Sequence, residues 1–182
     1  MPAQDSSNPS TTATNNFSGR DVAGILRERG WLAADPFPEQ AAWCERAAAL
    51  LGAHAAERAQ LSDLLSLIFH YDAGELLAKV ETHVVLSRSA ARDVLRHLAL
   101  LLLEPAPLSS ERFKEVVTAL KEGLDLRGRE LFHPLRLALA GRAGEGELDR
   151  VILLLDEAAA LPFAAPVKSA RERILEFCAS LD

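Results

Sequence analysis

The chain has 182 residues and a formal net charge of −6, with 49% apolar and only 5% aromatic side chains. This length suffices for one good core or for two small helical subdomains that share an interface. The negative charge disfavours non-specific binding to nucleic acid, so such a role needs a local basic face. No apolar run reaches the roughly 18 residues of a membrane span, and the N-terminus lacks the layout of a secretion signal. We therefore expect a cytoplasmic protein that does not enter the membrane.

The first 19 residues form a polar segment rich in Ser, Thr, Asn and Pro, for which we expect a disordered tail. Beyond this tail, apolar residues recur at three- and four-residue spacing, and leucine and alanine dominate, which favours helices over strands. The predicted fold class is all-α and multi-helical, with eight to ten helices. The segments predicted as helices are 20–29, 39–52, 57–70, 73–83, 87–103, 110–123, 147–161 and a last one that begins at Pro166.

The stretch EPAPLSS, residues 104–110, is the best internal boundary, because its two prolines separate two helical patterns. Ser109 or Ser110 then offers a hydroxyl that caps the helix that follows. We therefore expect two small helical subdomains, residues 20–104 and residues 105–182.

The stretch LFHPLRLALAGR, residues 131–142, places a proline and two arginines in an apolar run. Pro134 is tolerated at a first helical position, where its missing N–H would be unpaired anyway. Gly141 is expected to end the helix as a left-handed cap. Arg136 lies one residue from an apolar row, so we expect it to leave the core sideways. That row, which should anchor the helix, is formed by Leu131, Leu135 and Leu139.

No motif for catalysis or cofactor binding is present, since GxSxG, the P-loop and the dinucleotide glycine motif are all missing. The five histidines share no metal-ligand spacing, and Cys44 and Cys178 lie far apart, so neither a metal site nor a disulfide is indicated. The sequence predicts a protein without catalytic residues, cofactor, metal or evident small-molecule substrate.

Basic side chains gather in residues 111–142, where seven positive residues against five negative ones give a net charge of +2. Arginine suits phosphate groups and base edges because its planar fork donates two parallel hydrogen bonds. The alternative is that these residues cap helix ends and pair with neighbouring acids. The seven are Arg112, Lys114, Lys121, Arg127, Arg129, Arg136 and Arg142.

The segment RGRELFHPLRLALAGRAGEGEL, residues 127–148, resembles the C-terminal anticodon-binding region of bacterial glutamyl-tRNA synthetases, where a pattern close to KGKxLFxPLRxALTGxxxGPEL recurs. A second match is ERAQLSDLL, residues 57–65, which is similar to an ERxxTLxEL helix in the preceding subdomain of that family. The order and spacing of the two also agree, so the resemblance covers residues 20–165.

The resemblance implies a non-catalytic protein that binds the anticodon arm of a tRNA. The chain carries no HIGH-like or KMSKS-like segment, so we do not expect it to activate an amino acid. The resemblance implies anticodon or backbone contacts for Arg58 and Arg136. Lys121, Arg127, Arg129 and Arg142 are then expected to neutralise phosphates. Stacking partners for unpaired bases are few: Phe132, His133 and Tyr71.

The chain departs from the family pattern in the turn after the LFHPLR helix. Ala140 stands where the family has threonine, and Glu145-Gly146 replaces its glycine-proline pair. These changes and the acidic net charge support a different hypothesis, a protein-interaction or structural module that kept the fold and lost RNA binding. The predicted partner is thus a tRNA or a protein.

Overall fold

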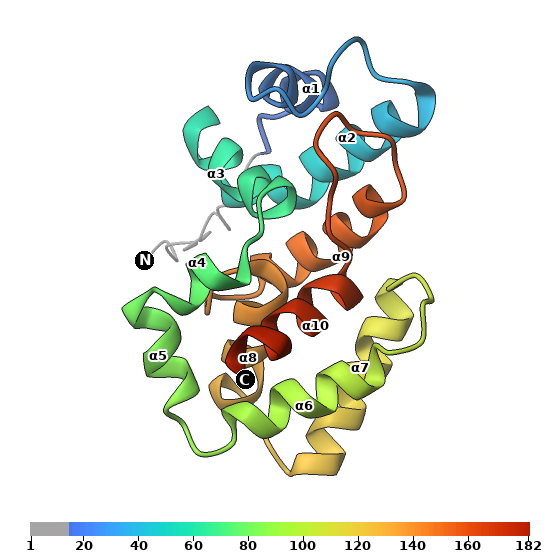
Figure 1. Ribbon diagram of the computed structural model, residues 1–182. Helices are drawn as coiled ribbons and strands as arrows, with labels where there is room; N and C mark the ends of the chain where they lie inside the picture. Colours follow the sequence, from blue (N-terminus) through green and yellow to red (C-terminus); the bar gives the residue numbers. More distant parts are fainter. Residues whose placement is uncertain (1–14) are drawn as a thin grey trace, which may run out of the picture.

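The structure is a computed structural model that describes residues 15–182, and within that range it is all-helical, as predicted. It holds ten α-helices and one short 3₁₀ helix there, with no β-strand (Figure 1). The elements are α1 (Gly19–Glu28), α2 (Pro38–Leu51), η1 (Gly52–His54), α3 (Arg58–Phe69), α4 (Ala73–Leu77), α5 (Val80–Leu86), α6 (Ala91–Leu101), α7 (Ser110–Leu124), α8 (Arg129–Ala140), α9 (Glu147–Ala159) and α10 (Ala170–Leu181).

The predicted tail falls mostly on residues 1–14, which lie outside the described residues. Residues 15–19 of that tail have defined contacts. The Asn15 side chain donates to the carbonyl oxygen of Ala48 at 2.8 Å. Ser18 caps α1, and the Asp21 carboxylate accepts a hydrogen bond from the Ser18 backbone N–H at 2.8 Å. This reciprocal capping box fixes the start of the first helix.

The helices form two groups that do not follow the chain order (Figure 1): one holds α1, α2, α3 and α9, and the other holds α4, α5, α6, α7, α8 and α10. α1 packs on α2, and α9 packs on α2 and α3 as well as on α8. α6 packs on α7 and α8, while α10 packs on α4, α6 and α8. Helices that precede residue 105 therefore pack on helices that follow it. The division into subdomains 20–104 and 105–182 stays a prediction.

One continuous apolar core runs through both groups. At one end Trp43 is fully buried, and its indole N–H donates to the carbonyl oxygen of Leu154 at 3.0 Å. Phe69 and Phe163 meet the Trp43 ring edge-on, with centroids 5.8 and 5.3 Å away. At the other end Phe177 of α10 is fully buried. The last helix thus contributes buried side chains to the same core as the earlier helices.

Three predicted helix boundaries are wrong. The helix predicted to begin at residue 87 begins at Ala91 as α6, because Ser87 ends the preceding helix α5. The segment 73–83 is not one helix, because the backbone of Lys79 is extended and lets α5 turn onto α8. The last helix starts at Ala170 instead of Pro166, because Ser169 and Glu172 form a capping box there. Ser109 caps α7, as one of the two predicted alternatives.

The predicted place of Pro134 is also wrong. α8 begins at Arg129, so the proline is the sixth helical residue and lies inside the helix. Its missing N–H leaves the carbonyl oxygen of Glu130 without its helical partner. Glu130 is exposed, so water can hydrate that carbonyl and the helix continues past the proline.

In the part of the chain that the structure describes, no helix has the length and apolar character needed to cross a bilayer.

Candidate nucleic-acid interface

Glycines with positive φ border α8 at both ends. Gly128 precedes it with φ of 58°, and Gly141 follows it with φ of 82°. The predicted left-handed cap at Gly141 is confirmed. The anchoring row of Leu131, Leu135 and Leu139 is buried, as predicted. This helix is therefore anchored in the core, where it packs on α6 and α10 and also on α9.

Arg136 is buried, with 9% of its surface exposed. Its Nε and Nη2 donate to the two carboxylate oxygens of Asp149 at 2.8 and 3.0 Å, and Nη1 donates to the Gly144 carbonyl oxygen at 2.9 Å. Its guanidinium carbon lies 4.6 Å from the centroid of the Phe132 ring. The expected sideways exit from the core is wrong, because Asp149 in the first turn of α9 offers a bidentate partner. Its role as an RNA contact stays a prediction.

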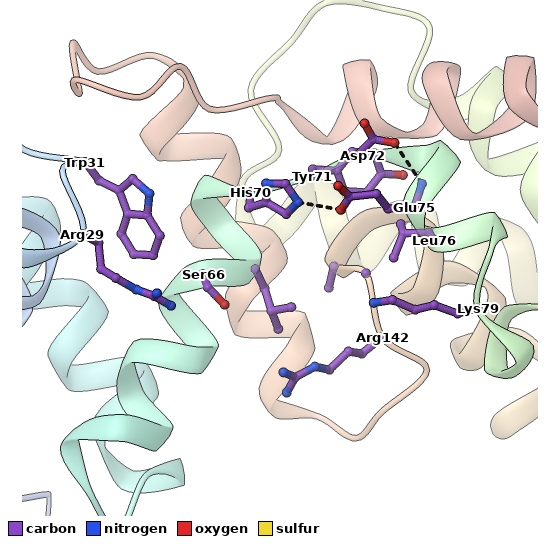
Figure 2. A pocket seen from close by; sticks show the side chains of 13 residues that line it. Arg29, Trp31, Ser66, His70, Tyr71, Asp72, Glu75, Leu76, Lys79 and Arg142 are labelled. Atoms are coloured by element: carbon purple, nitrogen blue, oxygen red, sulfur yellow. Dashed lines mark hydrogen bonds and ion pairs between the residues drawn. The ribbon is translucent and has the colours of Figure 1, made fainter.

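A groove of about 510 Å³ lies where the C-terminal ends of α3 and α8 meet α4 (Figure 2). It takes residues from three separate parts of the chain, and we call it the α3–α4–α8 groove. Its lining residues are Arg29, Trp31, Ser66, Leu67, His70, Tyr71, Asp72, Glu75, Leu76, Lys79, Ala140, Gly141 and Arg142.

Three cations line this groove: Arg29, Lys79 and Arg142. Figure 2 shows Arg29 beside Trp31 on one side and Lys79 on the other, with Arg142 between the two sides. Within residues 15–182, none of these cations forms an ion pair. Unpaired cations in a concave site attract anions, because the walls exclude part of the screening solvent.

The two carboxylates of the groove already have donors. Asp72 Oδ1 accepts the backbone N–H of Glu75 at 2.9 Å as the cap of α4, and Glu75 Oε2 lies 2.7 Å from His70 Nε2. Ser66 also lines the groove, but its hydroxyl donates to the carbonyl oxygen of Asp63 at 2.6 Å. The serine hydroxyl is therefore not aligned with His70 in the manner of an activated nucleophile.

The wall of the groove rests on a fully buried arginine, Arg173 of α10. Its guanidinium lies 4.7 Å from the Tyr71 ring centroid, and burial lowers its pKa to about 10, so it stays charged at neutral pH. In place of a carboxylate it donates to carbonyl oxygens, where the negative ends of helix dipoles stabilise its charge. The acceptors are Leu67 at 2.8 Å, Ile68 at 2.6 Å, Leu139 at 3.0 Å and Lys168 at 3.0 Å.

Tyr71, one of the predicted stacking residues, is buried against Arg173 instead of being free. Its hydroxyl donates to the carbonyl oxygen of Ala138 at 2.5 Å, and the Arg173 carbonyl oxygen lies 3.2 Å away. Burial raises the pKa of Tyr71 well above its usual range. The tyrosine is thus a structural part of the groove wall.

A second basic group lies at the end of α7 and the start of α8. Lys121 Nζ lies 5.5 Å from the centroid of the Phe132 ring, and Lys121 and Arg127 line one shallow hollow. Arg129 is exposed nearby. The structure therefore brings together four of the residues predicted for RNA binding.

His133 lies beside this group and is surrounded by positive charge. The Arg88 Nη1 lies 2.9 Å from His133 Nδ1. Partial burial lowers the pKa of His133, and the charges of Arg88 and Arg129 lower it further, whereas Glu145 raises it. A polyanion bound here would offset these positive charges.

Arg58 lies apart from both sites. It is the first residue of α3, and its Nη2 is 2.6 Å from Glu28 Oε1, whereas the groove begins at Ser66 near the other end of that helix. Of the predicted RNA-binding residues, Arg142 lines the groove, and the second basic group holds Lys121, Arg127, Arg129 and Phe132. Arg29, Trp31 and Lys79 were not predicted, because no local pattern marks residues that meet only in the folded chain.

The all-helical architecture and the family model together give the class of the protein, a helical anticodon-binding domain. The sequence model of the family described as anticodon binding domain matches residues 26–161. This match covers more than half of the chain, which therefore belongs to that family. The resemblance inferred from residues 127–148 and 57–65 is confirmed.

Bacterial glutamate–tRNA ligases are among the similar proteins. The chain is 38% identical to glutamate–tRNA ligase 2 of Syntrophus aciditrophicus over 87 residues, which cover 47% of this chain and 16% of that protein. It is 25% identical to glutamate–tRNA ligase of Exiguobacterium sibiricum over 131 residues, 72% of this chain and 27% of that protein. With glutamate–tRNA ligase 1 of Brucella ovis it shares 41% identity over 64 residues, 35% of this chain and 14% of that protein.

The chain thus spans less than one third of the length of these relatives. No solved structure matches it.

Proposed function

We propose that this chain is a non-catalytic tRNA-binding protein and that the α3–α4–α8 groove holds the anticodon arm. One observation carries the proposal: Arg29, Lys79 and Arg142 line the groove without ion pairs in the described chain, while both groove carboxylates have donors. Free cations are available to phosphates without breaking existing pairs. Membership of the anticodon binding domain family supports the choice of ligand.

The second basic group extends this proposal. Lys121, Arg127 and Arg129 neutralise phosphates that flank the unpaired bases, and Phe132 holds Lys121 through its ring. Arg58 and Arg136 are left out of the direct contacts, since Glu28 and Asp149 already hold their guanidinium groups.

The test is a mobility shift with total tRNA at low and moderate salt. We expect binding in about the micromolar range at low salt. The groove variant Arg29→Gln/Lys79→Gln/Arg142→Gln should weaken it and reduce the slope of log affinity against log salt by about two, as expected for three lost contacts to a single strand.

The control carries the same change in net charge on residues that do not line the groove, Arg20→Gln/Arg46→Gln/Arg96→Gln. It should change the salt slope little. Absence of tRNA binding at low salt, or equal weakening by both triple variants, contradicts the proposal.

The competing hypothesis is a protein-interaction module that has kept the fold. The observation on its side is a set of exposed apolar residues on α5 and at the end of α6, of which Val80 is 78% and Leu100 66% exposed. Apolar surface of this kind marks contact sites in other proteins. The tRNA experiment separates the two functions, since this one predicts no salt-dependent tRNA binding.

A further inference from the structure

The main chain of Trp31 is fixed at the edge of the groove. Gly30 has φ of 76° and ends α1, so the Trp31 N–H donates back to the Leu26 carbonyl oxygen at 2.8 Å. The Trp31 carbonyl oxygen accepts the N–H of Ala164 at 2.9 Å. One hydrogen bond to the preceding helix and one from a distant part of the chain therefore hold this residue in place.

The two faces of the Trp31 ring have different partners. Phe69 stacks on one face, with centroids 4.9 Å apart and an angle of 9° between the rings. The guanidinium carbon of Arg29 lies 5.1 Å from the Trp31 ring centroid. Since Phe69 occupies one face, the guanidinium takes the other.

The two partners differ in how firmly they are held. Phe69 is buried and belongs to the aromatic cluster with Trp43 and Phe163. Arg29 is exposed, and no carboxylate pairs with it in the described chain. An exposed cation–π contact contributes only about 0.5–1 kcal/mol, so an aromatic ligand can displace the arginine.

We propose that an unpaired RNA base stacks on Trp31 in the space that the Arg29 guanidinium occupies. This inference rests on the proposed function of the groove and adds the class of ligand that the tryptophan takes. The indole and Phe69 form a rigid platform that any base can stack on, because every base has a π-face. The displaced Arg29 pairs with the phosphate of the stacked nucleotide. Lys79 and Arg142, which line the same groove, contact the next phosphates.

The two tryptophans allow a direct test by NMR. Each gives one indole N–H signal, and a Trp31→Phe variant assigns them. Trp43 is fully buried and its N–H is bonded to Leu154, so its signal is an internal reference. Adding a trinucleotide RNA should shift the Trp31 indole and ring signals upfield through the ring current of the base, while the Trp43 signal stays in place.

Inorganic tripolyphosphate is the matched probe, because it carries phosphate charge and no base. Tripolyphosphate should cause no upfield shift of the Trp31 ring signals, because it has no base and hence no ring current. Equal shifts with tripolyphosphate, or unchanged Trp31 signals at saturating trinucleotide, overturn the inference. If tRNA binds in the mobility shift while Trp31 stays unchanged, this inference fails and the proposed function stands. If no tRNA binds, both fail.

Substitutions test the same contact with tRNA. Trp31→Leu keeps an apolar side chain on Phe69 but removes the π-face, so affinity should fall about tenfold. Trp31→Phe keeps the stacking surface and should stay within about threefold of the wild type. Thermal melting identifies any variant that fails to fold, and equal affinities for the Leu and Phe variants contradict base stacking.

Discussion

Two arginines of this chain lie in the interior, and each is held by a different kind of acceptor. Arg136 pairs with the Asp149 carboxylate, whereas the acceptors of Arg173 within residues 15–182 are all main-chain carbonyl oxygens. Removing Arg136 therefore leaves a carboxylate without its partner, whereas removing Arg173 leaves carbonyl oxygens without their donor. For Arg136 the remaining group is a half-buried charge.

Replacing Arg136 with alanine should lower the free energy of unfolding by about 2 kcal/mol. Loss of one partner of a buried pair costs about 3–5 kcal/mol, and Asp149 is exposed enough to recover part of that. Urea unfolding followed by circular dichroism measures the change. Adding Asp149→Asn should restore part of the loss, because the orphaned carboxylate is then gone. The exposed Arg142→Ala serves as control and should stay within about 0.5 kcal/mol of the wild type.

At the scale of the single helix, α8 ends at Gly141 because its backbone is left-handed there. A Cβ added to Gly141 would lie 3.6 Å from Leu76 Cδ2, which is an ordinary contact. Space is therefore available, and only the backbone angle opposes another residue. Gly123, inside α7, has an ordinary backbone angle and nothing within 4 Å of an added Cβ.

The same substitution should thus have opposite effects at these two glycines. Gly141→Ala is expected to lower the free energy of unfolding by about 1 kcal/mol, since alanine disfavours positive φ. Gly123→Ala should raise it by about 0.5 kcal/mol, because alanine is the better helix former. Parallel urea titrations of the two variants give the comparison. A loss at Gly123, or no loss at Gly141, contradicts the assignment.

Helices were predictable from the sequence where local spacing decides which residues are buried. In α8 the buried row was predictable, but the contacts of a side chain with another helix were not. The row Leu131, Leu135 and Leu139 follows from a four-residue repeat, and the structure confirms it. The direction of Arg136 depends on Asp149, which reaches it only through the turn between two helices. The groove was not predictable for the same reason. Arg29 and Lys79 lie 50 residues apart in the sequence, and only the folded chain places them along one groove.

At the scale of the whole molecule, Arg173 connects helices that are far apart in the chain. It holds the C-terminal ends of α3 and α8 together, and these ends form two sides of the groove. The relative position of the two helix groups therefore depends on a side chain from α10. Unlike a surface ion pair, this contact is shielded from salt by its burial.

Replacing Arg173 with methionine should lower the free energy of unfolding by about 3 kcal/mol or more, because several buried carbonyl oxygens lose their donor. Arg173→Lys should be intermediate, since an ammonium cannot span the same acceptors. Urea unfolding measures both, and hydrogen exchange should show faster opening at the ends of α3 and α8. A loss below about 1 kcal/mol for the methionine variant would show that the carbonyl oxygens find other donors.

The family match ends at residue 161, yet the interior does not. Arg173, Ile174 and Phe177 all lie beyond that point, and each is fully buried. A chain shortened at residue 161 would retain every matched residue and still expose the core along α4, α6 and α8. We therefore expect that the smallest part of this protein that folds independently extends past the matched residues 26–161 and includes α10.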